Sequence, residues 1–169
     1  MAFNEKPVLV VLGTRPEAIK LAPVIRSLKG RCHVKVCVTG QHRQMLDQTM
    51  ASLGISADID LDVMKPGQTL EELTANIIRS LGPVLEDVEP CVVIVQGDTT
   101  TAFLAGLAAF YKGIDVAHVE AGLRTGDLSS PWPEEGNRKL LTAISSLHFA
   151  PTQSAMQNLM KEGVPEVKI

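Results

Sequence analysis

Aromatic residues are scarce in this sequence and make up only 4% of its 169 residues. The hydrophobic content is nevertheless 45%, so the core has to be built from Val, Ile, Leu and Ala. Aliphatic runs of this kind are typical of parallel β-strands that helices bury on both faces. The shortage of aromatic residues therefore favours an α/β fold.

Other absences exclude whole classes of protein. No apolar run approaches the roughly 20 residues of a membrane-spanning helix, and a net charge of -3 gives no support to nucleic-acid binding, which favours a basic surface. The three cysteines show no CxxC spacing, and the four histidines form no HExxH or two-histidine metal pattern. We expect a protein of the reducing cytoplasm that binds no metal, no membrane and no nucleic acid.

Strand and helix patterns alternate along the chain. Short apolar runs predict strands at residues 8–12, 34–39, 58–63, 92–96, 116–120 and 148–150. Amphipathic or capped segments predict helices at residues 16–29, 43–53, 69–87, 99–112, 135–143 and 152–162. This alternation predicts one domain over residues 1–169, a Rossmann-like, doubly wound parallel sheet.

Polar residues follow several of the predicted strands. In such a sheet, ligands bind at the carboxyl ends of the strands. The loops that start at Gly13, Gly40, Gly97 and Ala121 are therefore expected to share one edge of the sheet. That edge is the predicted ligand site.

The first of these loops has the features of an anion site. Arg15 and Lys20 lie at the start of a predicted helix, whose N-terminus offers free N–H groups. The segment has a single glycine and matches neither a Walker A loop nor GxGxxG. The alternative interpretation is an ordinary turn with a solvated arginine.

Carboxylates gather after the later strands. Asp98 starts a predicted helix, so an N-cap role is the alternative to a ligand contact. Glu134 and Glu135 lie in a first helical turn, which the helix dipole favours, so one of them can be purely structural. Glu120 ends a buried strand and has no such structural explanation.

Neighbouring carboxylates can divide acid and base roles between them. Arg124 and Arg138 are placed to steady these acids or to meet a phosphate. His118, inside a predicted strand, is interpreted as a packed core histidine.

Four sequence segments resemble the bacterial non-hydrolysing UDP-N-acetylglucosamine 2-epimerases, and the resemblance covers essentially the whole length. The segments are GTRPEAIKLAPVI from Gly13, TGQHRQMLDQ from Thr39, GDTTTA from Gly97, and HVEAGLRTGDLSSPWPEEGNR from His118. The resemblance implies two Rossmann-like domains in a glycosyltransferase-B (GT-B) arrangement. On this view the chain is the N-terminal half of that fold, and the C-terminal UDP-binding domain is absent from it.

The resemblance also implies a reaction. The family interconverts UDP-N-acetylglucosamine and UDP-N-acetylmannosamine by eliminating UDP to 2-acetamidoglucal and adding it back, without a redox cofactor or a metal. The matching acids are Asp98, Glu120 and Glu134. Glu120 and Glu134 are expected to transfer protons, and Asp98 is expected to orient the sugar or stabilise charge.

Further residues match family positions that contact ligands. Arg15, Lys20 and Arg138 match positions that bind substrate or UDP. Some members also bind UDP-N-acetylglucosamine as an allosteric activator. The positions that match this activator site are Gln41, Gln44 and Gln68, and Gly67 stands where such members can carry an arginine.

Without the second domain, the chain is expected to fold but to be inactive, and the full-length protein is expected to form a homodimer, with the helix at 69–87 as a candidate contact. Two alternatives stay open. One is a hydrolysing relative, which releases UDP and free N-acetylmannosamine. The other is a non-catalytic module for nucleotide-sugar binding or assembly.

Overall fold

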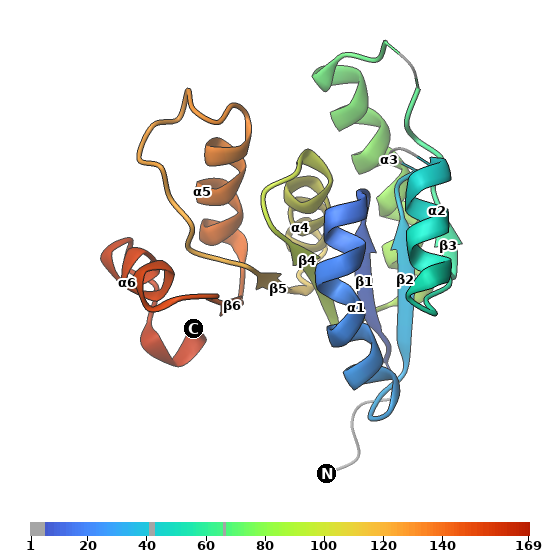
Figure 1. Cartoon of the computed structure of the whole chain (residues 1–169), viewed down its shortest axis with the longest axis horizontal. Helices are drawn as coiled ribbons and strands as arrows, with labels where there is room; N and C mark the ends of the chain where they lie inside the picture. The colour runs from blue at the N-terminus through green and yellow to red at the C-terminus, as the bar shows by residue number, and fades with distance from the viewer. Residues whose placement is uncertain (1–5, 41–42, 66) are drawn as a thin grey trace.

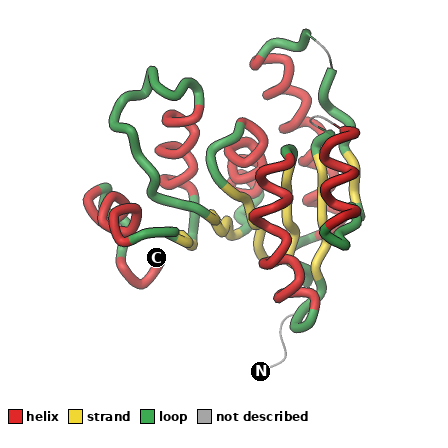
Figure 2. The backbone as a smooth tube through the Cα atoms, viewed as in Figure 1, coloured by secondary structure: helices red, strands yellow, loops and turns green. Residues whose placement is uncertain are grey.

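The fold is a parallel sheet covered by helices on both faces (Figures 1 and 2). The structure is a computed structural model that describes residues 6–40, 43–65 and 67–169. For residues 43 and 44 it describes the backbone only. Its strands are β1 (Val8–Leu12), β2 (Val34–Val38), β3 (Ile59–Asp60), β4 (Val92–Gln96), β5 (Asp115–Val119) and β6 (Leu147–Phe149). They are parallel and lie in the order β3-β2-β1-β4-β5-β6. This confirms the predicted doubly wound sheet.

The helices divide between the two faces. They are α1 (Arg15–Lys29), α2 (Arg43–Ser52), α3 (Leu70–Val88), α4 (Thr100–Tyr111), α5 (Glu134–Ile144), α6 (Gln153–Lys161) and the short η1 (Glu166–Lys168). Apolar residues of α1 and α2 pack with one face of β1 and β2, and those of α3 and α4 pack with the other face, where α5 packs against α4 and β5. Alternate residues of β1 serve both cores, which is why its pattern is continuously apolar. In the described ranges, no helix is both long enough and apolar enough to cross a membrane.

The third strand is shorter than predicted. The acid–aliphatic alternation predicts a strand at 58–63, but β3 contains only Ile59 and Asp60. Asp62 adopts a left-handed conformation with φ 47°, which takes the chain out of the extended conformation. The prediction was therefore wrong beyond Asp60.

The strands β1 and β4 are neighbours at the centre of the sheet. The strands β2 and β3 follow outward from β1, and β5 and β6 follow outward from β4 in the opposite direction. Loops that leave adjacent strands toward opposite faces open a crevice between them, where ligands of such folds bind. Close packing lies beneath this crevice. A Cβ on Gly13 would stand 2.5 Å from Thr39 Oγ1 and 2.7 Å from Thr101 Oγ1, so the first turn requires glycine.

Candidate active site

A cleft of about 460 Å³ opens at this crevice. Its lining includes the turns after β1 and β4 and the residue after β5. Four of the predicted site residues line it together: Arg15, Lys20, Asp98 and Glu120. The expectation that these loops share one edge of the sheet is thereby confirmed for the loops that start at Gly13 and Gly97, and Glu120, directly before the loop from Ala121, lies at the same edge.

Glu120 is held in the cleft from two sides. Its oxygens accept hydrogen bonds from Lys20 Nζ at 2.7 and 2.5 Å, and Gln96 Nε2 also donates to Oε2. Its backbone is left-handed, with φ 66°, a conformation that costs a residue with a side chain about 1–3 kcal/mol. Strain of this kind clusters at functional sites, and together with the place of Glu120 in the cleft it supports a functional role.

Asp98 faces α5. Arg138 approaches Asp98 Oδ2 with Nη2 at 2.5 Å and Nε at 2.8 Å. Asn137 Nδ2 donates to the Asp98 carbonyl at 2.9 Å. The side chain that caps α4 is that of Thr99, which accepts from Ala102 N at 3.0 Å. Asp98 is therefore not the N-cap, and its carboxylate forms an ion pair at the edge of the cleft.

Arg138 joins two acids. Besides Asp98, its Nη1 donates to Glu135 Oε2 at 3.2 Å. Burial acts to lower the pKa of Arg138, but the hydrogen bond and charge of Asp98, followed by those of Glu135, raise it overall. This arginine steadies acids, as one of the two predicted roles requires.

The neighbours Glu134 and Glu135 have opposite surroundings. Glu135 is fully buried, and it accepts hydrogen bonds from Thr125 N at 3.2 Å and Gly126 N at 3.1 Å. Burial raises its pKa, yet these bonds and Arg138 lower it overall. The Oε2 atom of Glu134 is also buried, but it has no hydrogen-bond partner among the described residues. Glu135 is thus the structural member of the pair.

His118 is a core residue, as predicted. Its side chain is 1% exposed, and its Nε2 lies 2.7 Å from the Gly97 carbonyl oxygen. Burial lowers the pKa of His118 to about 4. The neutral ring therefore holds the turn that carries Asp98.

Arg124 turns away from the cleft. It forms hydrogen bonds with both oxygens of Glu162, at 2.8 and 2.6 Å, and donates to Thr142 Oγ1 at 2.8 Å. Its charge contributes to the lowered pKa of Glu135. Of the two roles predicted for Arg124, steadying an acid fits this arrangement and meeting a phosphate does not.

The predicted activator residues are only partly described. Gln41 lies outside the described residues, and so does the side chain of Gln44. Gln68 precedes α3 and lines a hollow of about 500 Å³ that shares no lining residue with the cleft. Its Oε1 accepts from Lys65 N at 2.8 Å, and its buried Nε2 has no partner within the described ranges.

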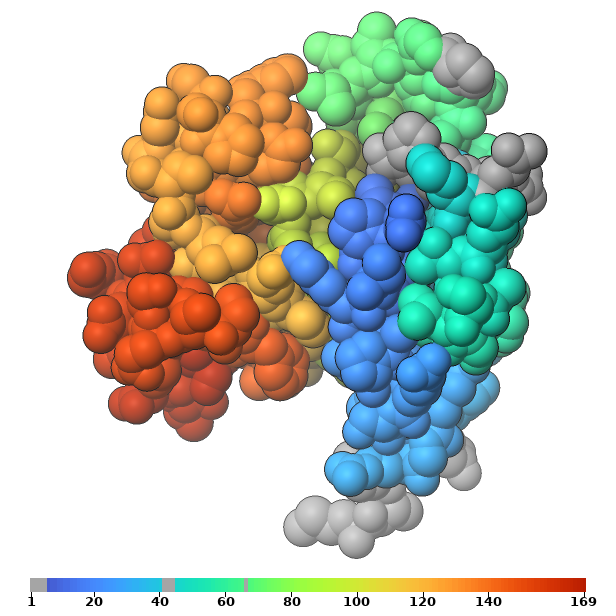
Figure 3. All heavy atoms as spheres, in the orientation of Figure 1, coloured from blue at the N-terminus to red at the C-terminus, as the bar shows by residue number. Residues whose placement is uncertain are grey.

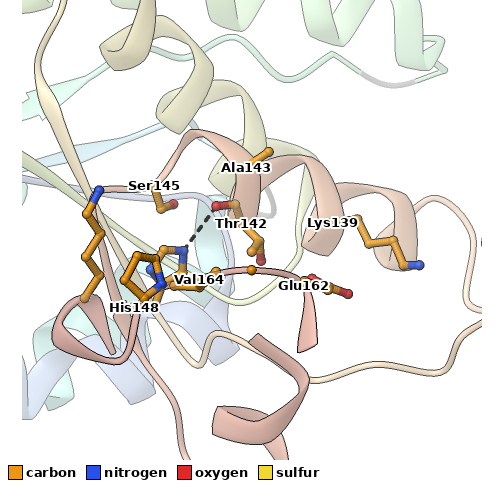
Figure 4. Close-up of a pocket in the computed structure, with 10 residues that line it drawn as sticks. Lys139, Thr142, Ala143, Ser145, His148, Glu162 and Val164 are labelled. Atoms are coloured by element: carbon orange, nitrogen blue, oxygen red, sulfur yellow. Dashed lines mark hydrogen bonds between the residues drawn. The ribbon is translucent and has the colours of Figure 1, made fainter. Parts of the chain in front are cut away.

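Two other hollows contain none of the predicted site residues. One, of about 490 Å³, is almost wholly apolar and lies between α1 and the strands β4 to β6. Figure 3 shows this side of the molecule, where the surface is hollowed between α1 in blue and the C-terminal segment in red. The other, of about 370 Å³, lies between α5, β6 and the C-terminal segment that contains η1. In it, His148 Nε2 is 3.1 Å from the Thr142 carbonyl oxygen (Figure 4). Of these hollows, the cleft holds two of the three predicted catalytic acids, Asp98 and Glu120, whereas Glu134 does not line it.

The cleft residues that were not predicted as site residues include Glu17, Gln96 and Thr99. The spacing of Thr14 and Glu17 matches a capping box, and this signal could have identified Glu17. Within the described part of the chain, no group of three or more His, Cys, Asp or Glu side chains is arranged to hold a metal ion.

The strand order and the cleft at the switch point define the class, a Rossmann-like domain of the GT-B type. A lipopolysaccharide outer core galactosyltransferase has the same fold at 10% identity, with a TM-score of 0.65 over 97% of this chain and 44% of that one. This likeness shows the fold alone.

The family is narrower than the class. The family model described as UDP-N-acetylglucosamine 2-epimerase matches residues 26–169, and the chain belongs to this family. UDP-N-acetylglucosamine 2-epimerases of Neisseria meningitidis and Salmonella typhimurium are 57% and 55% identical to it, over 96% of this chain and 44% of each of those proteins. The chain thus spans about half the length of these relatives.

Solved structures agree with the sequence comparison. The UDP-GlcNAc 2-epimerase of N. meningitidis, crystallised with UDP-GlcNAc, matches with a TM-score of 0.92 at 57% identity, over 96% of this chain and 45% of that one. The enzyme of Methanocaldococcus jannaschii, in complex with UDP-GlcNAc and UDP, matches with a TM-score of 0.91 at 40% identity, over 96% and 45%.

Proposed function

We propose that this chain forms the acid-bearing half of an enzyme that interconverts UDP-N-acetylglucosamine and UDP-N-acetylmannosamine. The observation that carries the proposal is the meeting of Asp98 and Glu120 with Arg15 and Lys20 in one cleft at the switch point of the sheet. Acids beside cations at a helix N-terminus suit a substrate that has a sugar on one side and a diphosphate on the other. The relatives crystallised with UDP-GlcNAc support the same substrate.

The residue types suit elimination and re-addition. The hydrogen on C2 of the sugar has no adjacent carbonyl, so direct deprotonation is difficult. Breaking the bond between C1 and the diphosphate oxygen first creates positive charge near C1, which a carboxylate such as Asp98 stabilises. Glu120 and Glu134 then serve as the two proton-transfer groups. One takes the C2 proton, which leaves 2-acetamidoglucal and UDP, and the other returns a proton to the opposite face of C2 while the UDP oxygen adds back to C1.

Lys20 connects the proposed diphosphate site with the proton acceptor Glu120. It holds Glu120 through contacts of 2.7 and 2.5 Å, and it lies on α1, one turn beyond Arg15. A diphosphate at the N-terminus of α1 competes with Glu120 for this ammonium group. Binding of the substrate would thereby free the Glu120 carboxylate to accept a proton.

The chain alone is expected to be inactive. The cleft is open, and the relatives are about twice as long, so the substrate contacts of this half are a part of the whole set. Purified 1–169, supplied with UDP-GlcNAc, should give no epimer above background. Epimerisation by the chain alone would contradict this part of the proposal.

Product analysis tests the function itself. NMR spectra of UDP-GlcNAc incubated with the whole protein should show UDP-ManNAc, with deuterium at C2 when the solvent is D₂O. Release of UDP and free N-acetylmannosamine would instead identify a hydrolysing enzyme. Binding without any conversion would identify a nucleotide-sugar binding module.

The assembly of the whole protein is part of the same proposal. We expect a cytoplasmic homodimer, with α3 as a candidate contact, and an activator UDP-GlcNAc near Gln68. Sedimentation of the whole protein tests the dimer. A sigmoidal dependence of the rate on UDP-GlcNAc, lost in Gln68→Ala, tests the activator.

A further inference from the structure

Glu17 is a buried carboxylate beneath the cleft. It lies in the first turn of α1 and is 1% exposed. Its Oε2 accepts hydrogen bonds from Gly13 N at 2.8 Å, Thr14 N at 2.6 Å and Thr14 Oγ1 at 2.8 Å. Glu17 thus fixes the turn between β1 and α1, the turn that leads into the predicted anion site.

The other oxygen of Glu17 reaches a different turn. Thr99 Oγ1 donates to Glu17 Oε1 at 2.6 Å. The same hydroxyl accepts from Ala102 N and caps α4, and Thr99 directly follows Asp98. One carboxylate therefore joins the anion-binding turn to the turn that carries Asp98, across 82 residues of sequence.

A second capping box in the chain shows that capping alone does not require this arrangement. At the start of α3, Glu72 accepts from Thr69 N at 3.0 Å, and Thr69 Oγ1 accepts from Glu72 N at 3.2 Å. Both of these bonds are exposed. Both helices have the same cap. Among the described residues, only the glutamate of α1 also accepts a hydrogen bond from a second turn, through Thr99.

Burial of Glu17 is unfavourable in itself. Burial raises the pKa of Glu17, although the bonds from Thr99, Gly13 and Thr14 oppose this shift. A helix cap can avoid that cost by remaining exposed, as Glu72 does. The bond to Thr99 therefore calls for a role other than capping.

We propose that Glu17 is a positioning residue that fixes the spacing between the diphosphate-binding turn and Asp98. This inference rests on the proposed function. Departure of the diphosphate and stabilisation of charge on the sugar occur together, so Arg15 and Asp98 have to be aligned at the same moment. A displacement of about 1 Å in such an arrangement can lower the rate about 100-fold.

Steady-state kinetics of the whole protein test the proposal. Glu17→Ala should lower kcat at least ~30-fold and change KM less than ~3-fold, because misalignment affects the transition state more than ground-state binding. Glu17→Gln, which keeps one acceptor oxygen, should recover part of the rate. Thr152→Val, which removes the N-cap of α6, should keep kcat within ~2-fold of the unmodified protein. All assays are run well below each variant's unfolding temperature.

A second pair of variants covers the case in which Glu17→Ala does not fold. Thr99→Val removes the link and the cap of α4 but keeps Glu17, and Thr152→Val removes the cap of α6 alone. Thr99→Val should lower kcat about 10-fold more than Thr152→Val, and Thr99→Ser should restore it. Equal effects of Thr99→Val and Thr152→Val, or of Glu17→Ala and Thr152→Val, would overturn the proposal.

The link can also be tested apart from the reaction. If the whole protein does not convert UDP-GlcNAc, the proposed function fails, and NMR of the 169-residue chain decides on the link itself. Glu17→Gln should shift the backbone amide signals of Asp98 and Thr99, whereas Glu72→Gln should leave them in place. Unchanged Asp98 and Thr99 signals in Glu17→Gln would show that the two turns are not coupled.

Discussion

The carboxylates at this edge of the sheet fall into two groups. Glu17 and Glu135 are buried, and backbone N–H groups donate to both of them. Glu120 is held by two side chains, Lys20 and Gln96, and remains about a quarter exposed. Backbone N–H groups thus hold the structural acids, whereas Glu120 is held by side chains alone.

The same contrast distinguishes neighbours in the sequence. Glu134 and Glu135 share one turn of α5, but only Glu135 has donors from the preceding loop. Residue type and position along a helix therefore do not distinguish the two acids. We propose that the backbone donors around Glu135 mark it as structural and leave Glu134 as the candidate for chemistry.

The largest expected effect is on turnover. Glu120→Gln in the whole protein should reduce kcat at least ~1,000-fold, because removal of an essential proton acceptor costs roughly 4 kcal/mol in the transition state. UDP should still bind, and the free energy of unfolding should change by less than about 1 kcal/mol, since exposed ion pairs contribute little. Steady-state kinetics, calorimetric titration and urea unfolding measure the three quantities. Near-normal turnover would remove Glu120 from the catalytic group.

The next effect concerns His118, the buried histidine that holds the turn carrying Asp98. The depressed pKa of His118, about 4 against an ordinary 6.5, means that the unfolded chain takes up this proton more readily than the folded one. The resulting stability is complete above pH 6.5 and is lost as the pH falls toward 4, by about 3 kcal/mol in all. Urea unfolding between pH 7 and pH 4 measures the loss, and an NMR titration of the ring gives the pKa. A ring that titrates near 6.5 would show that His118 is not held as a buried neutral residue.

A smaller difference should separate the two capping boxes. Glu17→Ala leaves the Gly13 N–H and the Thr99 hydroxyl without their partner and should cost about 2–3 kcal/mol of unfolding free energy. Glu72→Ala removes an exposed cap and should cost about 0.5–1 kcal/mol. Equal losses in the denaturant unfolding of the two variants would mean that burial and the link to Thr99 add nothing to the cap.

Local patterns were sufficient to predict the fold. Continuous apolar strands and capped helices predict a doubly wound sheet, and parallel strands place the ends of β1, β4 and β5 at one edge. The error at 58–63 arose because a left-handed residue, Asp62, ended the alternation early. A period-2 pattern contains no information on such a local change of φ.

The site could be predicted only in part. The sequence indicated Asp98, Glu120, Arg15 and Lys20, and the structure brings them into one cleft. The sequence did not indicate the link from Glu17 to Thr99. The two residues are 82 positions apart, and a glutamate in a first helical turn is typical of an ordinary cap. Pairings of this kind depend on the tertiary fold.

The most direct test applies the same substitution to two adjacent residues. Glu134→Gln should lower the turnover of the whole protein at least ~100-fold and leave the free energy of unfolding within about 0.5 kcal/mol, because no protein donor loses its partner. Glu135→Gln should lower the free energy of unfolding by about 2 kcal/mol and keep turnover within ~10-fold, because buried N–H donors lose a charged acceptor. Normal turnover in Glu134→Gln, or an equal loss of stability in both variants, would contradict the division between Glu134 as a catalytic acid and Glu135 as a structural one.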